Sequence, residues 1–483
     1  MRKNYDMAVI GGGPGGYVAA LRGSQLGLNV LLVEKERVGG VCLNRGCIPT
    51  KALLSDVEGI HWSRRAAREG IILQEPEISL AAMMKRKQTV VDKLVDNLEK
   101  LLAAAKVDVL RAAARIAAPE TVSLDTGETF HAKNIAIATG STAWAPPISG
   151  IGLPGVLNTR QALELERIPE SVVIIGGGVI GQEFASLFAG LGSKVTVLEV
   201  LDRILNEVDK DIAKRYATLV SARMRTETGI RVDSITTDGE KLKVHYEKRA
   251  QEKSVEADVV LLATGRRPYF DGLGLEELGI EIQNRAVLVD RRLRTSMSGV
   301  YAIGDVIGGK MLAHVASYHG EMVAENIAGH GRDVGDEPVP ACIFTTPQIA
   351  WVGPTEEQAQ ESGLPYRTSM FSLSANGKAL ALGESRGWVK LMEDSTTGRL
   401  IAAHLLGPQV SELVSELALA IQKGLSAADI AGTIHPHPTL SESVREAALG
   451  FLGGPVHAAA NVKSFNGSSP VSRRVATSKS ITD

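Results

Sequence analysis

Residues 7–34 read MAVIGGGPGGYVAALRGSQLGLNVLLVE, and this stretch decides the fold class. An apolar run leads into a glycine-rich turn, a small-residue segment of helical length, and a second apolar run that ends in Glu34. This order predicts strand–turn–helix–strand, the start of a parallel βαβ unit. The same pattern returns in residues 172–199, VVIIGGGVIGQEFASLFAGLGSKVTVLE. We therefore expect an α/β fold with two nucleotide-binding domains of related plan.

Both stretches carry the G-x-G-x-x-G spacing of a dinucleotide-binding turn. The glycines are Gly11, Gly13, Gly16, Gly176, Gly178 and Gly181. The first glycine of each set permits the tight turn, the second lets a pyrophosphate approach the backbone, and the third lets helix and strand pack closely. The helix then offers its free N–H groups to the phosphates. One such set would be weak evidence, but here each follows a predicted strand and opens a predicted helix.

An acid ends the second strand of each unit. Glu34 and Glu199 each lie 23 residues after the first glycine of their set. A carboxylate there can accept hydrogen bonds from a ribose 2′-OH and repels a 2′-phosphate, which favours FAD and NAD over NADP. Arg203, four residues after Glu199, could still reach a phosphate, so NADP stays open. Two nucleotide sites in one chain imply two cofactors that exchange electrons, and these could be a tightly held flavin and a nicotinamide that comes and goes.

Three further glycine turns are candidates for cofactor contacts. The runs IAIATGSTAW (135–144) and LLATGRRPYF (261–270) both end a predicted strand in Ala-Thr-Gly. They place Thr139 and Gly140 at the flavin and Gly265 at the nicotinamide nucleotide. In YAIGDV, Asp305 could hold the ribityl hydroxyls of a flavin or lie near its phosphates. An ordinary Gly-Asp turn is the alternative for this last motif.

The segment GGVCLNRGCIPTK (39–51) holds two of the three cysteines, Cys42 and Cys47. Structural zinc needs four ligands, usually as two close pairs, and Cys342 stands alone as a small hydrophobe, so we expect no metal. Pro49 suits the first turn of a helix that begins near Cys47. A helix N-terminus and the charge of Lys51 would both lower a thiol pKa, which favours a redox pair.

A second chemical motif is HPHPTLSES (435–443). His437 precedes a proline and is biased away from helix. A histidine near its ordinary pKa can take a thiol proton at neutral pH. Thr439 and Glu442 have capping-box spacing, so the alternative is that Glu442 only caps a helix and His437 is an ordinary loop residue.

Composition excludes some partners. The 483 residues carry 53 Lys+Arg and 55 Asp+Glu, a net charge of −2, which gives no reason to expect nucleic acid or an acidic membrane. The N-terminus MRKNYDMAVIGGG lacks the pattern of a secretory signal, and the apolar runs are of strand length. We expect a soluble cytoplasmic protein, where a close cysteine pair is more often catalytic than structural.

Other segments indicate the remaining architecture. Residues 85–105 predict a helix with one apolar stripe, formed by Val90, Val91, Leu94, Leu98, Leu101 and Leu102. Strand-like and helical runs mix in residues 342–455, which is typical of an α+β domain. Residues 456–483 are rich in Ser, Lys and Arg without periodicity, and we expect a disordered tail.

Taken together, the motifs resemble those of the pyridine nucleotide-disulfide oxidoreductases over residues 1–455. The resemblance rests on GGVCLNRGCIPTKALL, both glycine sets, both ATG strands, YAIGDV, FTTPQIAWVG and IHPHPTLSES. Within the family it is strongest to the members that oxidise dihydrolipoyl groups. It implies two Rossmann-like domains for FAD (1–149) and NAD (150–275), a central domain (276–341) and an α+β dimerisation domain (342–455).

The resemblance also implies residue roles. Cys42 would be the thiol that meets the substrate, and Cys47 the thiol beside the flavin. Lys51 and Glu183 would form an ion pair near flavin N5. His437, oriented by Glu442, would be the general base for the cysteine pair of the other subunit in a homodimer.

The implied reaction is oxidation of a dihydrolipoyl dithiol by NAD⁺ through FAD. The implied partner is the lipoyl domain of a 2-oxoacid dehydrogenase or glycine cleavage complex. One alternative is a glutathione-type reductase, although the spacer LNRG differs from its common VNVG and Glu199 disfavours NADPH. Another is a low-turnover scaffold flavoprotein, against which the intact Cys42, Cys47, His437 and Glu442 speak.

Overall fold

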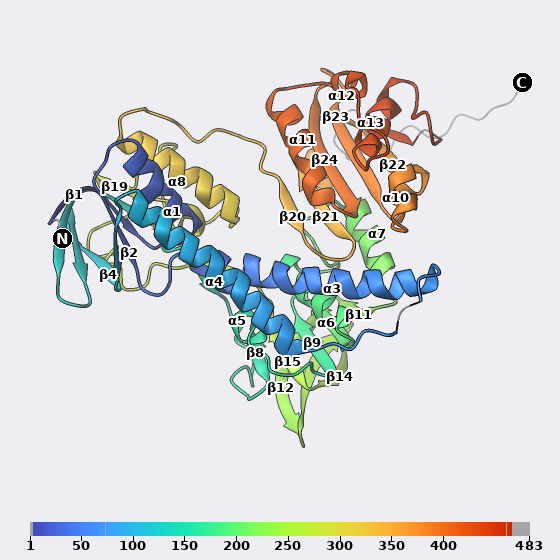
Figure 1. Cartoon of the computed structure of the whole chain (residues 1–483), viewed down its shortest axis with the longest axis horizontal. Coiled ribbons are helices and arrows are strands. Elements are labelled where there is room, and N and C mark those ends of the chain that lie inside the picture. Colours follow the sequence, from blue (N-terminus) through green and yellow to red (C-terminus); the bar gives the residue numbers. More distant parts are fainter. Residues whose placement is uncertain (1–2, 73, 460, 466–483) are drawn as a thin grey trace, which may run out of the picture. The chain divides into compact units, whose positions relative to one another are not determined.

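The computed structural model describes residues 3–72, 74–459 and 461–465 (Figure 1). The chain forms two compact units, and each is described by itself. The first comprises residues 1–200 and 229–336, and the second comprises residues 201–228 and 337–483. The segment 201–228, which lies inside the predicted NAD domain, thus groups with the C-terminal residues. Within the described parts of the chain, none of the helices has both the length and the apolar content that crossing a membrane requires.

The first unit contains a sheet with the order β3-β2-β1-β6-β5-β4, and β19 also pairs with β6. Strands β1, β2, β3, β6 and β19 run parallel, whereas β4 and β5 add an antiparallel edge. The strands are β1 Asn4–Ile10, β2 Val30–Glu34, β3 Asp108–Arg111, β4 Ala114–Ala118, β5 Thr121–Leu124, β6 Thr129–Ile137 and β19 Val300–Ala302. Its associated helices are α1 Pro14–Gln25, α2 Gly40–Arg45, α3 Cys47–Arg68, α4 Leu80–Ala104, the 3₁₀ turn η1 Gly304–Ile307 and α8 Ala313–Ile327.

A second parallel sheet repeats the βαβ plan. In it β9 lies between β10 and β15, and β15 also pairs with β8. Its elements are β8 Val156–Asn158, α5 Thr159–Ala162, β9 Ser171–Ile175, α6 Val179–Gly190, β10 Lys194–Glu199 and β15 Val259–Leu262. The two strand–helix–strand predictions, residues 7–34 and 172–199, are therefore confirmed as β1-α1-β2 and β9-α6-β10.

Smaller ribbons complete the first unit. An antiparallel sheet is formed by β12 Ile230–Asp238, β13 Lys241–Lys248 and β14 Gln251–Ala257. Two antiparallel pairs are β7 Ser141–Ala143 with β16 Arg266–Pro268, and β17 Ile282–Gln283 with β18 Ala286–Val287. In the β7–β16 pair, the segment after the first ATG turn hydrogen-bonds to the segment after the second ATG turn. The pair therefore connects the loops at the ends of the two parallel sheets.

The second unit is built on an antiparallel sheet with the order β20-β21-β24-β23-β22-β25. Its strands are β20 Ala341–Ile343, β21 Gln348–Val352, β22 Tyr366–Ser372, β23 Trp388–Asp394, β24 Leu400–Gly407 and β25 Val462–Phe465. The unit also contains α7 Lys210–Val220, β11 Met224–Thr228, α9 Glu356–Glu361, η2 Leu373–Ala375, α10 Gly377–Ala381, α11 Val410–Gln422, α12 Ala427–Gly432, α13 Glu442–Leu449 and η3 Gly450–Leu452. This composition agrees with the predicted α+β character.

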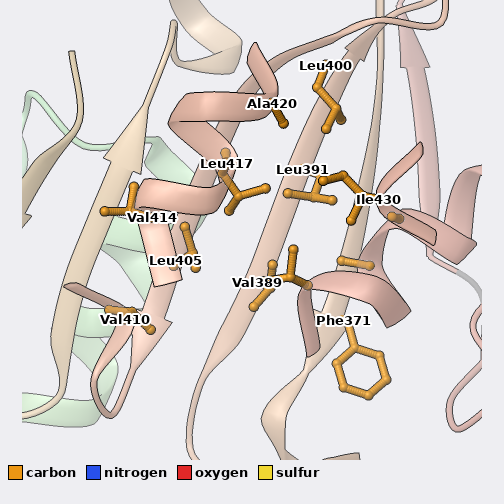
Figure 2. Close-up of a cluster of buried hydrophobic side chains, with 14 of the residues drawn as sticks. Phe371, Val389, Leu391, Leu400, Leu405, Val410, Val414, Leu417, Ala420 and Ile430 are labelled. Carbon is orange, nitrogen blue, oxygen red and sulfur yellow. The ribbon is translucent and has the colours of Figure 1, made fainter. Parts of the chain in front are cut away.

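The core of the second unit forms where α11 packs on the sheet (Figure 2). One face of α11 presents Val410, Val414, Leu417 and Ala420 at helical spacing, and all four are buried. They face sheet side chains such as Leu405 in β24 (Figure 2). Full burial of a side chain of this size stabilises a fold by roughly 1.5–3 kcal/mol, so this face anchors the helix.

Two predictions need correction. Within residues 85–105 the buried apolar positions are Val91, Val95, Leu98 and Leu102, whereas Leu94 and Leu101 of the predicted stripe are exposed. The buried stripe is narrower because only positions on one line of the helix reach the neighbouring elements. In the predicted disordered tail, residues 462–465 form β25, an edge strand whose backbone pairs with β22. Residues 466–483 lie outside the described part.

Candidate active site

Glycine is required at the first nucleotide-binding turn. Gly11 has φ +105°, and a Cβ there would lie 2.4 Å from the carbonyl oxygen of Ala138. A Cβ on Gly16 would lie 1.8 Å from the carbonyl oxygen of Gly11. The helix α1 starts after Gly13 without a side-chain cap, so no capping side chain competes with a phosphate for its first N–H groups. The turn therefore fits a pyrophosphate.

The second nucleotide-binding turn has the same geometry. Gly176 has φ +110°, and a Cβ on Gly181 would lie 1.9 Å from the carbonyl oxygen of Gly176. The helix α6 starts after Gly178, again without a side-chain cap. The first unit thus contains two backbone turns of similar shape, each suited to a phosphate, and this agrees with two dinucleotide cofactors.

The two strand-end acids make equivalent contacts. The N–H of Gly12 donates to Glu34 Oε2 at 2.7 Å, and the N–H of Gly177 donates to Glu199 Oε2 at 2.5 Å. Each carboxylate is therefore held over its own glycine turn. A carboxylate in this position is suited to a ribose with a free 2′-OH.

The alternative role of Arg203 is not supported by its contacts. Its guanidinium donates two hydrogen bonds to Glu357, at 2.6 and 2.9 Å, and one to the carbonyl oxygen of Asn206. A bidentate pair of this kind holds the guanidinium in a defined position. Arg203 is thus engaged within its own unit rather than available for a 2′-phosphate.

The cysteine pair lies on two consecutive helices. Cys42 is in α2, and Cys47 is the first residue of α3, after Gly46. The predicted helix start at Cys47 is confirmed, with Pro49 in the first turn. The structure holds both residues as free thiols, and each is half-buried.

The two thiols differ in acidity. The Cys42 thiol donates a hydrogen bond to the Cys47 sulfur, which raises the pKa of Cys42. The same bond lowers the pKa of Cys47 to about 7, with help from the Lys51 ammonium and against the effect of burial. Cys47 is therefore the thiolate of the reduced pair near neutral pH.

Lys51 and Glu183 form an ion pair between α3 and α6. The Lys51 Nζ lies 2.8 and 2.7 Å from the two carboxylate oxygens of Glu183. The Glu183 side chain is 7% exposed, so the pair is largely shielded from water. The structure brings these two residues together across 132 positions of sequence.

In the second unit, the Glu442 carboxylate bridges two groups. Its Oε1 lies 2.8 Å from His437 Nδ1, and its Oε2 accepts a hydrogen bond from the Thr439 N–H at 2.8 Å. Burial alone would raise the pKa of Glu442, but the bonds from Thr439 and His437 outweigh it and lower that pKa. The Glu442 carboxylate thus contacts both His437 and the Thr439 backbone, but Thr439 is not the N-cap of α13, whose N-cap Ser441 makes no side-chain cap. The helix α13 begins at Glu442, later than the capping-box spacing predicts.

The remaining candidates surround the nucleotide turns. The Thr139 hydroxyl donates to the carbonyl oxygen of Tyr269 at 2.5 Å. Gly140 and Gly265 have φ of +70° and +108°, in the left-handed region that favours glycine. Asp305 Oδ2 accepts a hydrogen bond from the Ser141 hydroxyl at 2.5 Å.

Sequence reasoning missed three residues of this region. The Asn44 side chain donates to the carbonyl oxygens of Val38 and Gly40, both at 3.0 Å, and so fixes the helix that carries Cys42. Ser141 and Arg266 are joined by hydrogen bonds beside Asp305. Their only sequence signal is the position directly after the two ATG turns.

One acidic cluster in the second unit has the spacing of metal ligands. It consists of Asp209, Asp211 and Glu356. The Lys390 Nζ lies among these carboxylates, at 2.8, 3.3 and 2.5 Å. Burial alone would lower the pKa of Lys390, but the carboxylates outweigh it and raise that pKa. An ammonium therefore takes the central position of the cluster.

The geometry predicts the titration of the thiol pair. In the reduced protein we expect thiolate to appear as pH rises through about 7, the pKa of Cys47. Lys51→Met removes the nearby positive charge and its ion pair with Glu183, so the midpoint should rise by about one unit. Ultraviolet thiolate absorbance, corrected with Cys47→Ser, measures it. Lys93→Met, an exposed change in α4, is the control. A wild-type midpoint near 9, the ordinary thiol value, would contradict the assignment.

Comparison with known proteins places these features in context. Residues 5–320 match the family model described as pyridine nucleotide-disulphide oxidoreductase, and residues 339–448 match the dimerisation domain of the same family. The chain is 40% identical over 470 residues to a dihydrolipoyl dehydrogenase of Geobacillus stearothermophilus, covering 94% of this chain and 97% of the relative.

Two solved structures are also similar. The HOCl-induced flavoprotein disulfide reductase RclA from Escherichia coli has a TM-score of 0.84 and 31% identity, covering 92% of this chain and 99% of that one. LpdA from Mycobacterium tuberculosis has a TM-score of 0.85 and 29% identity, covering 92% and 98%. The two glycine turns, the thiol pair and the His437–Glu442 contact lie within the matched stretches of the family models.

Proposed function

This chain belongs to the pyridine nucleotide-disulphide oxidoreductase family, and from that premise we propose that it oxidises dihydrolipoyl groups to lipoyl groups with NAD⁺. It is a flavoprotein disulfide oxidoreductase whose cofactors are FAD and NAD. The observation that carries the substrate proposal is the thiol pair itself. Cys47 is an acidic thiol beside Lys51, whereas Cys42 keeps its proton, so the two sulfurs are suited to different partners.

The residues that would hold the cofactors follow from the two turns. FAD would be held by Gly11, Gly13, Gly16, Glu34, Lys51, Thr139, Gly140 and Asp305, and NAD by Gly176, Gly178, Gly181, Glu199 and Gly265. The uncapped starts of α1 and α6 support this assignment, because both present backbone N–H groups to phosphate. When bound, FAD would supply the transfer of two electrons from the thiol pair to the nicotinamide.

The proposed cycle begins with Cys42 and Cys47 joined as a disulfide. His437 takes the proton from one substrate thiol, and the resulting thiolate attacks the Cys42 sulfur. The Cys42–Cys47 bond breaks, and Cys47 leaves as the thiolate that its low pKa favours. The second substrate thiol then attacks the substrate sulfur of the mixed disulfide, which breaks the bond to Cys42 and closes the lipoyl ring, and its proton passes to the departing Cys42 sulfur. The cysteine pair has gained two electrons, and the substrate has lost two.

His437 is proposed to act on the thiol pair of the other subunit in a homodimer. The match of residues 339–448 to a dimerisation domain supports the dimer. Glu442 would keep the imidazole oriented, because its carboxylate is fixed at both oxygens. Ionised Glu442 also stabilises the imidazolium that forms after proton transfer.

The proposed partner is the lipoyl domain of a 2-oxoacid dehydrogenase or glycine cleavage complex. The relative's name, dihydrolipoyl dehydrogenase, supports the lipoyl substrate. A cytoplasmic location is part of the proposal, because a reducing compartment suits a chain with a reactive thiol pair. A direct assay of dihydrolipoamide with NAD⁺ against glutathione disulfide with NADPH tests the function. Turnover in the second assay alone would contradict it.

Cofactor choice gives a separate prediction. Glu199→Gln should raise the KM for NAD⁺ about tenfold, because the hydrogen bond that the ribose hydroxyl donates to a charged acceptor is worth about 1.5 kcal/mol or more. NADP⁺ should remain a poor substrate, since Arg203 stays bound to Glu357. Steady-state kinetics with both nucleotides measures this. Glu170→Gln, an exposed change before β9, is the control. Efficient NADP⁺ use by Glu199→Gln would show that Arg203 is available after all.

A further inference from the structure

A partly buried hydrogen-bonded chain of Arg266, Ser141 and Asp305 lies beside the proposed flavin site. The Arg266 Nε donates to the Ser141 hydroxyl oxygen at 2.8 Å, and its Nη2 donates to the Ser141 carbonyl oxygen at 2.6 Å. The Ser141 hydroxyl in turn donates to Asp305 Oδ2. Ser141 is 8% exposed, so the link between guanidinium and carboxylate is shielded from water.

The β7–β16 ribbon determines which arginine joins this chain. Arg266 pairs with Ala143 and Arg267 pairs with Thr142 in the antiparallel register. Because successive side chains of a strand point to opposite faces, Arg266 and Arg267 cannot serve the same side. Arg266 is half-buried and contacts Ser141, whereas Arg267 is exposed.

The charged ends of this hydrogen-bonded chain, Arg266 and Asp305, also interact electrostatically with the two thiols. The contact with Cys47 raises the pKa of Cys42 most, burial adds to the increase, Lys51 opposes it, and the Asp305 charge adds a smaller increase. Burial lowers the pKa of Arg266, while Asp305 and Cys47 act in the opposite direction and Arg45 adds to the lowering.

Three further elements contribute charged or titratable groups that act on the Cys42–Cys47 pair. These groups are Lys51 in α3, Glu183 in α6 and Tyr17 in α1. Among these groups, Lys51 already has its own carboxylate, Glu183. Arg266 is the cation linked to Asp305, through the Ser141 hydroxyl.

We propose that Arg266 is a positioning residue that, through Ser141, orients the Asp305 carboxylate toward FAD and offsets its charge beside the Cys42–Cys47 pair. This inference rests on the proposed function only in taking Asp305 as a flavin contact. Without the guanidinium, the Ser141 hydroxyl loses the donor that fixes it, and the carboxylate loses its orientation. The thiol pair also loses a nearby positive charge, so the thiolate becomes less stable.

The experiment compares Arg266→Met with Arg267→Met in the FAD-loaded protein. After reduction of the cysteine pair, the ultraviolet thiolate absorbance is titrated with pH and corrected with Cys47→Ser. Arg266→Met should raise the midpoint by about one unit, and the FAD dissociation constant should increase about tenfold. Arg267→Met should match the wild type in both, because an exposed charge is screened by solvent.

Two further variants keep the proposal testable. Ser141→Ala removes the hydroxyl link without removing a charge, so it should weaken FAD binding while shifting the midpoint less than Arg266→Met. In an Asp305→Asn background, Arg266→Met should shift the midpoint less than in the wild type, because the charge to be offset is gone. Equal midpoints and equal FAD affinities for Arg266→Met and Arg267→Met would overturn the inference. Neither measurement uses a lipoyl substrate, so failure of the proposed reaction would be seen separately.

Discussion

Cys42→Ser should lower dihydrolipoamide-dependent reduction of NAD⁺ at least about 1,000-fold, since a serine hydroxyl cannot form the disulfide that accepts the two electrons. The loss should appear in kcat, because the chemical step itself is removed. Steady-state formation of NADH measures it.

Two controls separate this loss from damage to the fold. Cys342→Ser changes the third cysteine, which lies in β20 and packs against the core of the second unit. It should keep most of the turnover. Cys42→Ser itself should still oxidise NADH with ferricyanide, a reaction that needs bound FAD but no thiol. Full dihydrolipoamide turnover in Cys42→Ser would rule out the proposed cycle.

His437→Gln should lower kcat/KM for dihydrolipoamide by about 100- to 10,000-fold, the range expected for loss of a general base. His457→Gln is a matched control, because His457 Nδ1 lies 2.9 Å from a Glu446 oxygen in a similar His–Glu pair outside the proposed site. Its turnover should stay near the wild-type value. If the two variants lost activity equally, His437 would have no special role.

Mixed dimers test whether the site is shared between subunits. A dimer of one Cys42→Ser chain and one His437→Gln chain contains one intact site if each thiol pair uses the histidine of the other chain. It should then recover about half of the wild-type turnover, whereas either variant alone is nearly inactive. If Cys42 and His437 of the same chain worked together, both sites would be defective and the mixed dimer would stay inactive.

Much of the fold is predictable because its signals are local. The two βαβ units follow from alternating apolar runs and from glycines whose left-handed or crowded backbone positions exclude a Cβ. The start of α3 at Cys47 follows from the residues of its first turn. The sequence predictions are wrong where burial or strand pairing depends on contacts with other elements of the fold. The exposed Leu94 and Leu101 of α4 and the strand β25 depend on which surfaces lie next to them.

The chemistry of the site likewise depends partly on local sequence and partly on contacts between distant residues. From its sequence this chain can be read as two dinucleotide turns, a redox cysteine pair and a His–Glu motif, because the residues of each lie within a few positions of one another. A lowered thiol pKa at the helix start near Cys47 was predictable from the helix and from Lys51, whereas the hydrogen bond from Cys42, the largest cause of the shift, was seen only in the folded segment.

Only the tertiary structure could decide which distant groups meet. Arg203 could have bound a phosphate until its contacts with Glu357, 154 residues away, were seen. Ser141 lies 125 residues from Arg266 and 164 from Asp305, and no periodicity or motif spans such intervals. Local sequence determines backbone turns and helix starts through short-range sterics. The pairing of buried charges is decided by the packing of whole elements, because only packing removes the water that would otherwise solvate them.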